Sequence, residues 1–341
     1  MNATIKDVAK RAGVSISTVS LVLNRKGSVS KETELKVLQA VEELNFHPQR
    51  TARGLVTKQT GNFGFILSSD HFSQAEPFYT KIFLGTEFEA RSHDYYILLT
   101  TVEPSVSAKT MPRFLLERNV DGVILAGAVP RELVDYLDKI ALPFVLVDYY
   151  FAERNDSVVL MDNASGIRQA LDHLLGLGHK EFAFIGGDMR HPSMQKRCRT
   201  FRAYLEEKGI VLNEAAIECD DERSGPEAGF AAANRLLDKG LSVTAIVAAN
   251  DAMAVGVLRA CRDRKLRIPE DIAVTGFDNV ESSITARPTL TTIHVPKEEM
   301  GAAAVRHLVD LIRGEQSLGM RIIMPVRLIP RESTLGAKSG T

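Results

Sequence analysis

Within the first 50 residues, apolar positions recur at intervals of three and four, which is the spacing of an amphipathic helix. This spacing predicts a first helix over residues 5–12. Its apolar face consists of Ile5, Val8, Ala9 and Ala12. Thr4 and Asp7 match a capping box at the start of this helix, and Gly13 suits the left-handed conformation that ends it.

Two further short helices follow. Ser15 can cap a helix over residues 16–24, and Ser30 precedes a third helix that ends before Pro48. The apolar stripe of the second helix consists of Val19, Val22 and Leu23. We expect the stripe of the third helix to consist of Leu35, Leu38, Val41 and Leu44. Two short helices joined by a turn that contains glycine, with a third closing the core, predict a helix-turn-helix head.

From residue 61 onward, short apolar runs alternate with helical stretches. The runs are residues 63–67, 95–99, 122–126 and 144–147, then residues 182–186, 245–248 and 272–276. The helical stretches include residues 78–91, 131–139, 166–177, 195–208, 227–239 and 252–264. This alternation is typical of parallel sheets covered by helices on both faces. The pattern therefore predicts a body of two doubly wound parallel-sheet lobes.

Short polar side chains follow several of the predicted strands, at the edge where open parallel sheets bind ligands. They include Asp70, Asp148, Asn250 and Asp278. Any one of them could instead cap the helix that follows its strand. As a set they favour a site for a polyhydroxylated ligand between the lobes, because carboxylates and amides bond well to paired hydroxyls.

The overall charge is close to zero, since 42 Lys and Arg stand against 43 Asp and Glu in 341 residues. Residues 1–60, however, carry ten basic and five acidic residues, a net charge of +5, and the rest carries 32 and 38, a net charge of −6. A basic head on an acidic body favours a nucleic-acid partner for the head. Charge alone is equally consistent with a solvated basic face.

The remaining composition narrows the class of protein. Cys198, Cys219 and Cys261 are too few for a disulfide framework, and the first residues lack the apolar run of a secretory signal, so we expect a cytoplasmic protein. No apolar run reaches the roughly 18 residues of a membrane span. The eight histidines are scattered, and the motifs H-E-x-x-H, C-x-x-C, G-x-S-x-G and the P-loop are absent. We therefore expect no enzyme, no metal site and no cofactor.

The head resembles the DNA-binding domain of the LacI/GalR family of bacterial transcription regulators. The resemblance rests on two runs, T-I-K-D-V-A-K-R-A-G-V-S-x-S-T-V-S-x-V-L-N and N-F-H-P-Q-R-T-A-R-G-L. It implies a lambda-repressor-like all-α head over residues 1–47, whose second helix enters the major groove. The positions that match base-reading residues are Ile16, Ser17 and Leu21. The other matching DNA-contact positions are Thr4, Ser15, Thr18, Ser20 and Asn24. Leu21 replaces a residue that is often polar or basic, and two roles stay open for it: packing against a thymine methyl group, or reading no base.

Residues 48–60 resemble the hinge helix of the same family. Such a short segment is not a stable helix by itself. The resemblance implies that it folds when two copies pair in the minor groove. Leu55 then matches the leucine that is wedged between base pairs, flanked by Arg50 and Arg53.

The resemblance continues through the body, in P-F-V-L-V-D, A-A-N-D-A-M-A-V-G, I-P-E-D-I-A-V-T-G-F-D-N and P-x-L-T-T-I-H. It implies a periplasmic-binding-protein-like fold over residues 61–341. We expect an N-terminal lobe of about residues 61–161 plus 279–294, and a C-terminal lobe of about residues 162–278 plus 295–331. The positions that match effector contacts are Asp70, Phe78, Tyr79, Asp148, Tyr149, His191, Arg197, Asn250 and Asp278. Two residues depart from the family pattern: Thr200 stands in place of a glycine, and Ser224 stands in place of an aromatic residue. Asn163 is expected to have a mainly structural role.

The resemblance implies a repressor that binds a near-palindromic DNA operator as a homodimer. A small effector, a sugar or a sugar derivative, is expected to bind between the lobes and to control operator binding. Two alternatives stay open on the sequence. The same regulator could be controlled by a partner protein, or the chain could be a sugar-binding receptor without a DNA function.

Overall fold

The structure is a computed structural model. It describes residues 3–23, 29–46, 59–69, 77–103, 105, 110–219, 223–316 and 319–335. The chain divides into two compact units, Met1–Gly61 and Asn62–Thr341, which are described separately. Among the described residues, no helix is both long enough and apolar enough to cross a membrane.

The first unit contains the three predicted helices, α1 (Ile5–Ala12), α2 (Ile16–Leu23) and α3 (Lys31–Glu43). The capping box forms, since the backbone N–H and the hydroxyl of Thr4 donate to Asp7 at 2.8 and 2.6 Å. Gly13 ends α1 in the left-handed region at φ 66°. The apolar faces of the three helices meet in one core.

The predicted apolar stripe of α3 is wrong in its first half. Leu35 and Leu38 are 68% and 47% exposed, whereas Val37 and Ala40 are buried. The buried residues continue at helical spacing into Val41 and Leu44, so both stripes have the period of a helix. Packing against α1 and α2 decides which of the two faces inward.

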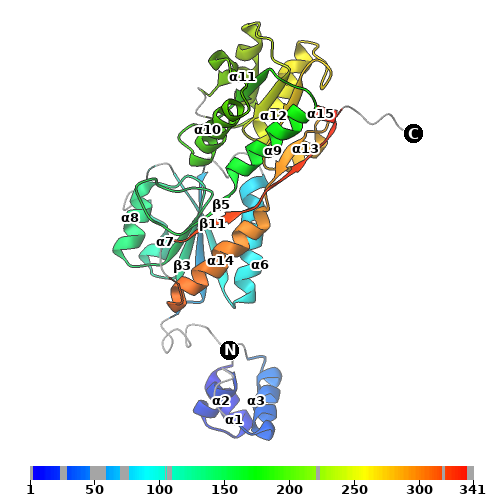
Figure 1. Ribbon diagram of the computed structural model, residues 1–341. Helices are drawn as coiled ribbons and strands as arrows, with labels where there is room; N and C mark the ends of the chain where they lie inside the picture. Colours follow the sequence, from blue (N-terminus) through cyan, green and yellow to red (C-terminus); the bar gives the residue numbers. More distant parts are fainter. Residues whose placement is uncertain are drawn as a thin grey trace, which may run out of the picture. The chain divides into compact units, whose positions relative to one another are not determined.

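The first lobe of the second unit is built on a six-stranded parallel sheet in the order β11-β5-β4-β3-β1-β2 (Figure 1). Its strands are β1 (Asn62–Ser68), β2 (Tyr96–Val102), β3 (Gly122–Ala126), β4 (Phe144–Val147), β5 (Val158–Met161) and β11 (Arg321–Met324). Its helices are α6 (Pro77–Ser92), α7 (Arg113–Leu116), α8 (Arg131–Lys139) and α14 (Lys297–Arg313). Side chains alternate along each strand: Ile124 packs on the face that α6 and α14 cover, and Val123 and Leu125 pack on the face of α7 and α8.

The second lobe has a four-stranded parallel sheet in the order β7-β6-β8-β9. Its strands are β6 (Phe182–Ile185), β7 (Ile217–Glu218), β8 (Ala245–Ala248) and β9 (Ala273–Thr275). Helices α9 (Asn163–Gly176) and α10 (Pro192–Glu207) cover one face, and α11 (Pro226–Asp238) and α12 (Asp251–Asp263) cover the other. The remaining elements are η1 (Glu214–Ala216), α13 (Glu281–Thr285), β10 (Thr292–His294), β12 (Arg327–Ile329) and α15 (Glu332–Leu335). The predicted fold class, a helix-turn-helix head and two doubly wound parallel-sheet lobes, is confirmed.

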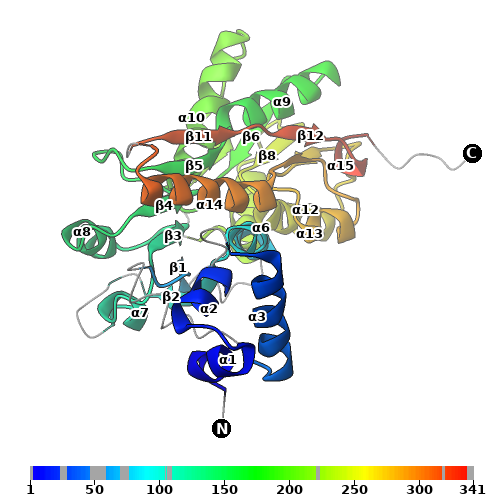
Figure 2. The ribbon, with the colours of Figure 1, turned by 90° about the horizontal axis from the view of Figure 1, so that it is seen from below.

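The structure corrects the expected division between the lobes. Helix α14 packs on α6, β3, β4 and β5, and β11 pairs with β5, so both belong to the first lobe and not to the second. Conversely, α13 packs on α12, and β10 pairs with β12 beside α9. The chain therefore passes between the lobes three times, near Asp162, near Val295 and between β11 and β12. Figure 2 shows β11 and β12 following one another along both lobes.

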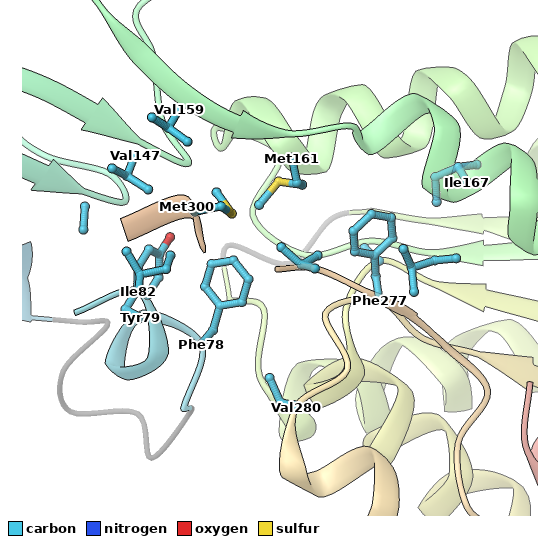
Figure 3. Packing of buried hydrophobic residues seen from close by; sticks show 14 of the residues in the cluster. Phe78, Tyr79, Ile82, Val147, Val159, Met161, Ile167, Phe277, Val280 and Met300 are labelled. Carbon is cyan, nitrogen blue, oxygen red and sulfur yellow. The ribbon is translucent and has the colours of Figure 1, made fainter. Parts of the chain in front are cut away.

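One apolar cluster continues from the first lobe into the second. Phe78 and Met300 belong to the first lobe, Phe277 belongs to the second, and Met161 ends the strand that leads from one to the other. Figure 3 shows Phe78, Met161 and Met300 close together, with Phe277 and Ile167 beyond them. The ends of the parallel strands near these crossings are thereby held at the junction of the two lobes.

Candidate functional site

In the head, α2 presents the three predicted base-reading residues to solvent. Ile16 and Leu21 are 45% and 43% exposed, and Ser17 is exposed as well, while Val19 and Val22 are buried in the core. Large apolar side chains on an exposed helix face leave water only when a partner covers them. The surface of α2 thus suits an apolar contact flanked by a hydroxyl group.

Several other predicted DNA contacts already have local partners. Ser15 accepts a hydrogen bond from the backbone N–H of Thr18 at 3.1 Å, and the two hydroxyls are 2.9 Å apart. Thr4 is held by Asp7, and Ser20 is half-buried. These bonds fix the starts of α1 and α2, which leaves the exposed side chains of α2 in a defined orientation.

Five predicted contacts lie outside the described residues. They are Asn24, Arg50, Arg53, Leu55 and Asp70. The hinge assignment therefore stays a prediction from the sequence.

Asp148 joins the two lobes. It follows β4 in the left-handed region, at φ 60°, and its side chain is buried. The hydroxyl of Tyr79 in α6 donates to its Oδ2 at 3.0 Å, and the hydroxyl of Ser193 in α10 donates to its Oδ1 at 2.8 Å. Burial and the Asp148 carboxylate raise the pKa of Tyr79, so its hydroxyl stays protonated as a donor.

Arg197 lies at the centre of the site. It is 2% exposed, and its guanidinium donates to Asn163 Oδ1 at 2.7 Å and to the carbonyl oxygen of Ala249 at 2.6 Å. A third nitrogen lies 3.4 Å from Asp278 Oδ1. The guanidinium also lies 3.6 Å from the centroid of the Phe277 ring. Contacts with one helix and the ends of two strands hold this fork in one orientation.

Asp278 faces two buried cations. Besides Arg197, the Nζ of Lys297 donates to the backbone carbonyl oxygen of Asp278 at 2.5 Å. Burial raises the pKa of Asp278 from 3.8 to about 6, although both cations oppose this shift. Burial likewise lowers the pKa of Lys297. Charged groups are thus concentrated where the lobes meet, and each is hydrogen-bonded to neighbouring protein groups.

Aromatic rings border this network. Phe78 and Tyr79 form an edge-to-face pair with centroids 5.1 Å apart, and the ring of Tyr149 is 5.5 Å from that of His191. Burial lowers the pKa of His191, and its Nδ1 accepts from the backbone N–H of Ser193 at 3.2 Å. The proton of the neutral ring is therefore on Nε2, which is 3.8 Å from Asp148.

Asn250, unlike the residues above, makes its side-chain hydrogen bonds away from this network. Its Oδ1 accepts from the backbone N–H of Met253, which caps α12, and its Nδ2 donates to the carbonyl oxygen of Ser224. Both functional ends of the amide are therefore bonded within the second lobe. Its neighbour Ala249, through a backbone carbonyl, supplies the contact to Arg197.

The structure brings together most of the predicted effector residues, and it adds three more. Tyr79, Asp148, His191, Arg197 and Asp278 belong to one connected network that includes Ser193, Asn163 and Lys297. Asn163, expected to be mainly structural, also donates to Ser193 Oγ at 3.2 Å. Residues 162–166, D-N-A-S-G, also match the family pattern and are a usable sequence signal for Asn163, whereas Ser193 and Lys297 lie in no such run.

The comparisons with known proteins agree with this architecture. Residues 4–49 match the family described as bacterial regulatory proteins, lacI family, and residues 171–334 match a periplasmic binding protein-like domain. The HTH-type transcriptional repressor PurR of Pasteurella multocida is 34% identical over 337 residues, 97% of this chain and 98% of that protein.

Two solved structures cover nearly the whole chain. The complex of the transcriptional regulator CelR with cellobiose is 32% identical, with a TM-score of 0.74 over 97% of this chain and 99% of that chain. The lac repressor dimer bound to operator and the anti-inducer ONPF is 29% identical, with a TM-score of 0.82 over 98% of this chain and 99% of that chain. The chain therefore belongs to the lacI family of bacterial regulatory proteins, which are DNA-binding regulators of transcription.

Proposed function

We propose that this protein is a repressor that binds a near-palindromic operator as a homodimer and is controlled by a sugar or a sugar derivative between its lobes. The network around Arg197 and Asp278 carries the proposal. It offers a guanidinium fork, carboxylates, an amide and hydroxyls beside aromatic rings, which is the combination that hydroxylated rings require.

Hydroxyl groups of the effector would replace hydrogen bonds that the two lobes now make with each other. The bond from Ser193 to Asp148 crosses between the lobes, and so does the proximity of His191 to Asp148. A ligand that bonds to both sides changes how firmly the lobes are held together. That differential contact is the source of an allosteric coupling, typically about 1–3 kcal/mol.

DNA binding is assigned to the head and to the segment that follows it. Residues 1–60 carry a net charge of +5, and α2 exposes Ile16, Ser17 and Leu21. Phosphate contacts supply affinity, and side chains in the major groove supply sequence preference. A DNA partner in a bacterium also places the protein in the cytoplasm, at the nucleoid.

The homodimer is assigned to exposed apolar residues on one side of the first lobe, Leu84, Phe88 and Leu99. These side chains are 38%, 61% and 44% exposed on α6 and on β2, which is at an edge of the sheet. A second copy of the same surface would cover them, as a two-fold interface requires. A dimer of heads then matches two operator half-sites.

Calorimetry and operator titration test the effector. The full chain would be titrated with a panel of mono- and disaccharides that includes cellobiose, and its operator would be selected from random duplexes. A sugar that binds, and that changes operator affinity about fivefold or more, is expected. Arg197→Lys, which keeps the charge and removes the fork, should lose sugar binding and retain operator binding.

The outcomes distinguish the alternatives. An operator-binding protein that responds to no sugar would favour control by a partner protein. A protein that binds sugar but no DNA would favour a receptor. Phe88→Glu should convert the dimer to a monomer in sedimentation, and a variant that stays dimeric would contradict the assigned interface.

A further inference from the structure

Two of the three cysteines lie side by side in the second lobe, at a place that the proposed function does not use. The sulfur atoms of Cys198, in α10, and Cys219, which follows β7, are 3.8 Å apart. A disulfide requires about 2.05 Å, so an approach of less than 2 Å closes the pair. Cys261, the third cysteine, is fully buried in the opposite helical layer.

The surroundings of the pair leave room for the sulfur atoms. Gly186, at the end of β6, lies against Cys219, and a Cβ added to it would be 2.8 Å from that sulfur. A larger residue at this position would displace the thiol. Cys198 is 5% exposed and Cys219 is half-buried, so a small oxidant can approach from the side of Cys219.

The pair is also set up for thiolate chemistry. The hydrogen bond with Cys219 and the neighbouring guanidinium of Arg202 lower the pKa of Cys198 to about 6. The same pairing, together with burial, raises the pKa of Cys219. One sulfur is therefore a nucleophile near neutral pH, and the other stays a thiol at its side, which is the arrangement of a reactive and a resolving cysteine.

We propose that Cys198 and Cys219 form a peroxide-sensitive dithiol that closes reversibly to an intramolecular disulfide. The Cys198 thiolate attacks one oxygen of hydrogen peroxide, giving a sulfenic acid and hydroxide. The Cys219 thiol then attacks the Cys198 sulfur, and its proton leaves with the hydroxyl group of the sulfenic acid as water. The proton that Cys198 released on ionisation neutralises the hydroxide of the first step. Two thiols are oxidised by two electrons, and one peroxide is reduced to two waters.

The location gives this modification a route to the effector site. Cys198 is the next residue after Arg197 on α10, and Arg197 holds Asn163, Ala249 and Asp278. A disulfide from Cys198 to the end of β7 would tie the helix that carries Arg197 to the sheet.

Thiol counting on the full-length protein tests the proposal. Treatment with hydrogen peroxide should reduce the free thiols of the denatured protein from three to one and lower the mass by about 2 Da, and dithiothreitol should restore both. A tryptic digest should contain residues 198–199 linked to residues 209–223. Cys261→Ser should still form this bond, whereas Cys198→Ser and Cys219→Ser should not.

Several results would overturn the proposal. They are a thiol count that stays at three, a bond that includes Cys261 or a second chain, and stable oxidation of Cys198 without a bond to Cys219. The linked peptide is measured on the natural protein, so the proposal is tested even if a serine variant does not fold.

Discussion

The hydroxyl of Ser193 in the second lobe lies 2.8 Å from a carboxylate oxygen of Asp148 in the first lobe. Both side chains are buried, so this bond holds the two lobes together away from water. Asp148 has Tyr79, in its own lobe, as a second donor, so only the bond from Ser193 depends on how the lobes are arranged. The contact between the lobes is therefore polar as well as apolar.

Removing the Ser193 hydroxyl should weaken the body. Ser193→Ala leaves a buried carboxylate with one donor fewer, and we expect the free energy of unfolding to fall by about 1–3 kcal/mol in urea titrations. The matched control is Ser92→Ala, because the Ser92 hydroxyl bonds to Glu89 in an exposed part of α6. Equal effects of the two substitutions would contradict the role of Ser193.

The backbones of α6 and α14 touch at Gly301, and we expect that no side chain fits at this position. A Cβ added to Gly301 would be 2.1 Å from the carbonyl oxygen of Ile82. Gly301→Ala should therefore separate the helices and lower the free energy of unfolding by about 2–3 kcal/mol. Gly176→Ala, at a helical position with nothing within 4 Å, should leave the protein unchanged or more stable by about 0.5–1 kcal/mol. Thermal denaturation of both variants distinguishes close packing from a general effect of alanine.

Asp278 should make stability depend on pH with a defined sign. Its pKa rises from 3.8 to about 6 in the folded protein, so its stabilising effect is complete below 3.8 and is lost as the pH rises through about 6. Asp278→Asn should flatten this part of the pH profile by about 3 kcal/mol. Burial also raises the pKa of Asp251. Asp251 is still present in the variant, so part of the dependence of stability on pH should remain.

Urea titrations at several pH values between 3.8 and 6 measure this slope. Asp271→Asn is the control, because its salt bridge with Arg267 lowers the pKa of Asp271 to about 2. That substitution should leave the slope above about pH 5 unchanged, because Asp271 is ionised there in both the folded and the unfolded protein. If the free energy of unfolding depends on pH equally in Asp278→Asn and in the natural protein, the raised pKa of Asp278 is contradicted.

Leu21 should recognise thymine through its methyl group. Replacing the contacted thymine of the selected operator by uracil should weaken binding of the natural protein by about 1 kcal/mol, roughly fivefold. Leu21→Ala should bind both duplexes equally weakly, because it lacks the packing partner. Leu35→Ala, at an exposed residue of α3, should discriminate as the natural protein does. Fluorescence anisotropy measures the six affinities, and discrimination that survives in Leu21→Ala would contradict the contact.

Local periodicity was enough to locate the head and the alternation of the body. Helix α1 begins after Thr4 and ends at Gly13 because capping is a local interaction between residues a few positions apart. Likewise, inner strands of the body such as β1, β3 and β4 are short apolar runs whose two faces are both buried. Motifs in fixed order then indicated Arg197 and Asp278 as members of the site.

Only the tertiary structure decided which elements share a lobe and which side chains meet. The sequences of α14 and β11 do not predict that these elements pack on α6 and β5, more than 100 residues away. An apolar helix face or strand of this kind could pack equally well on the sheet of either lobe. The same holds for Ser193 and Asp148, which are 45 residues apart and meet where the chain crosses between the lobes. Periodicity and capping are set by neighbours in the chain, whereas the partners of a buried side chain are set by long-range packing.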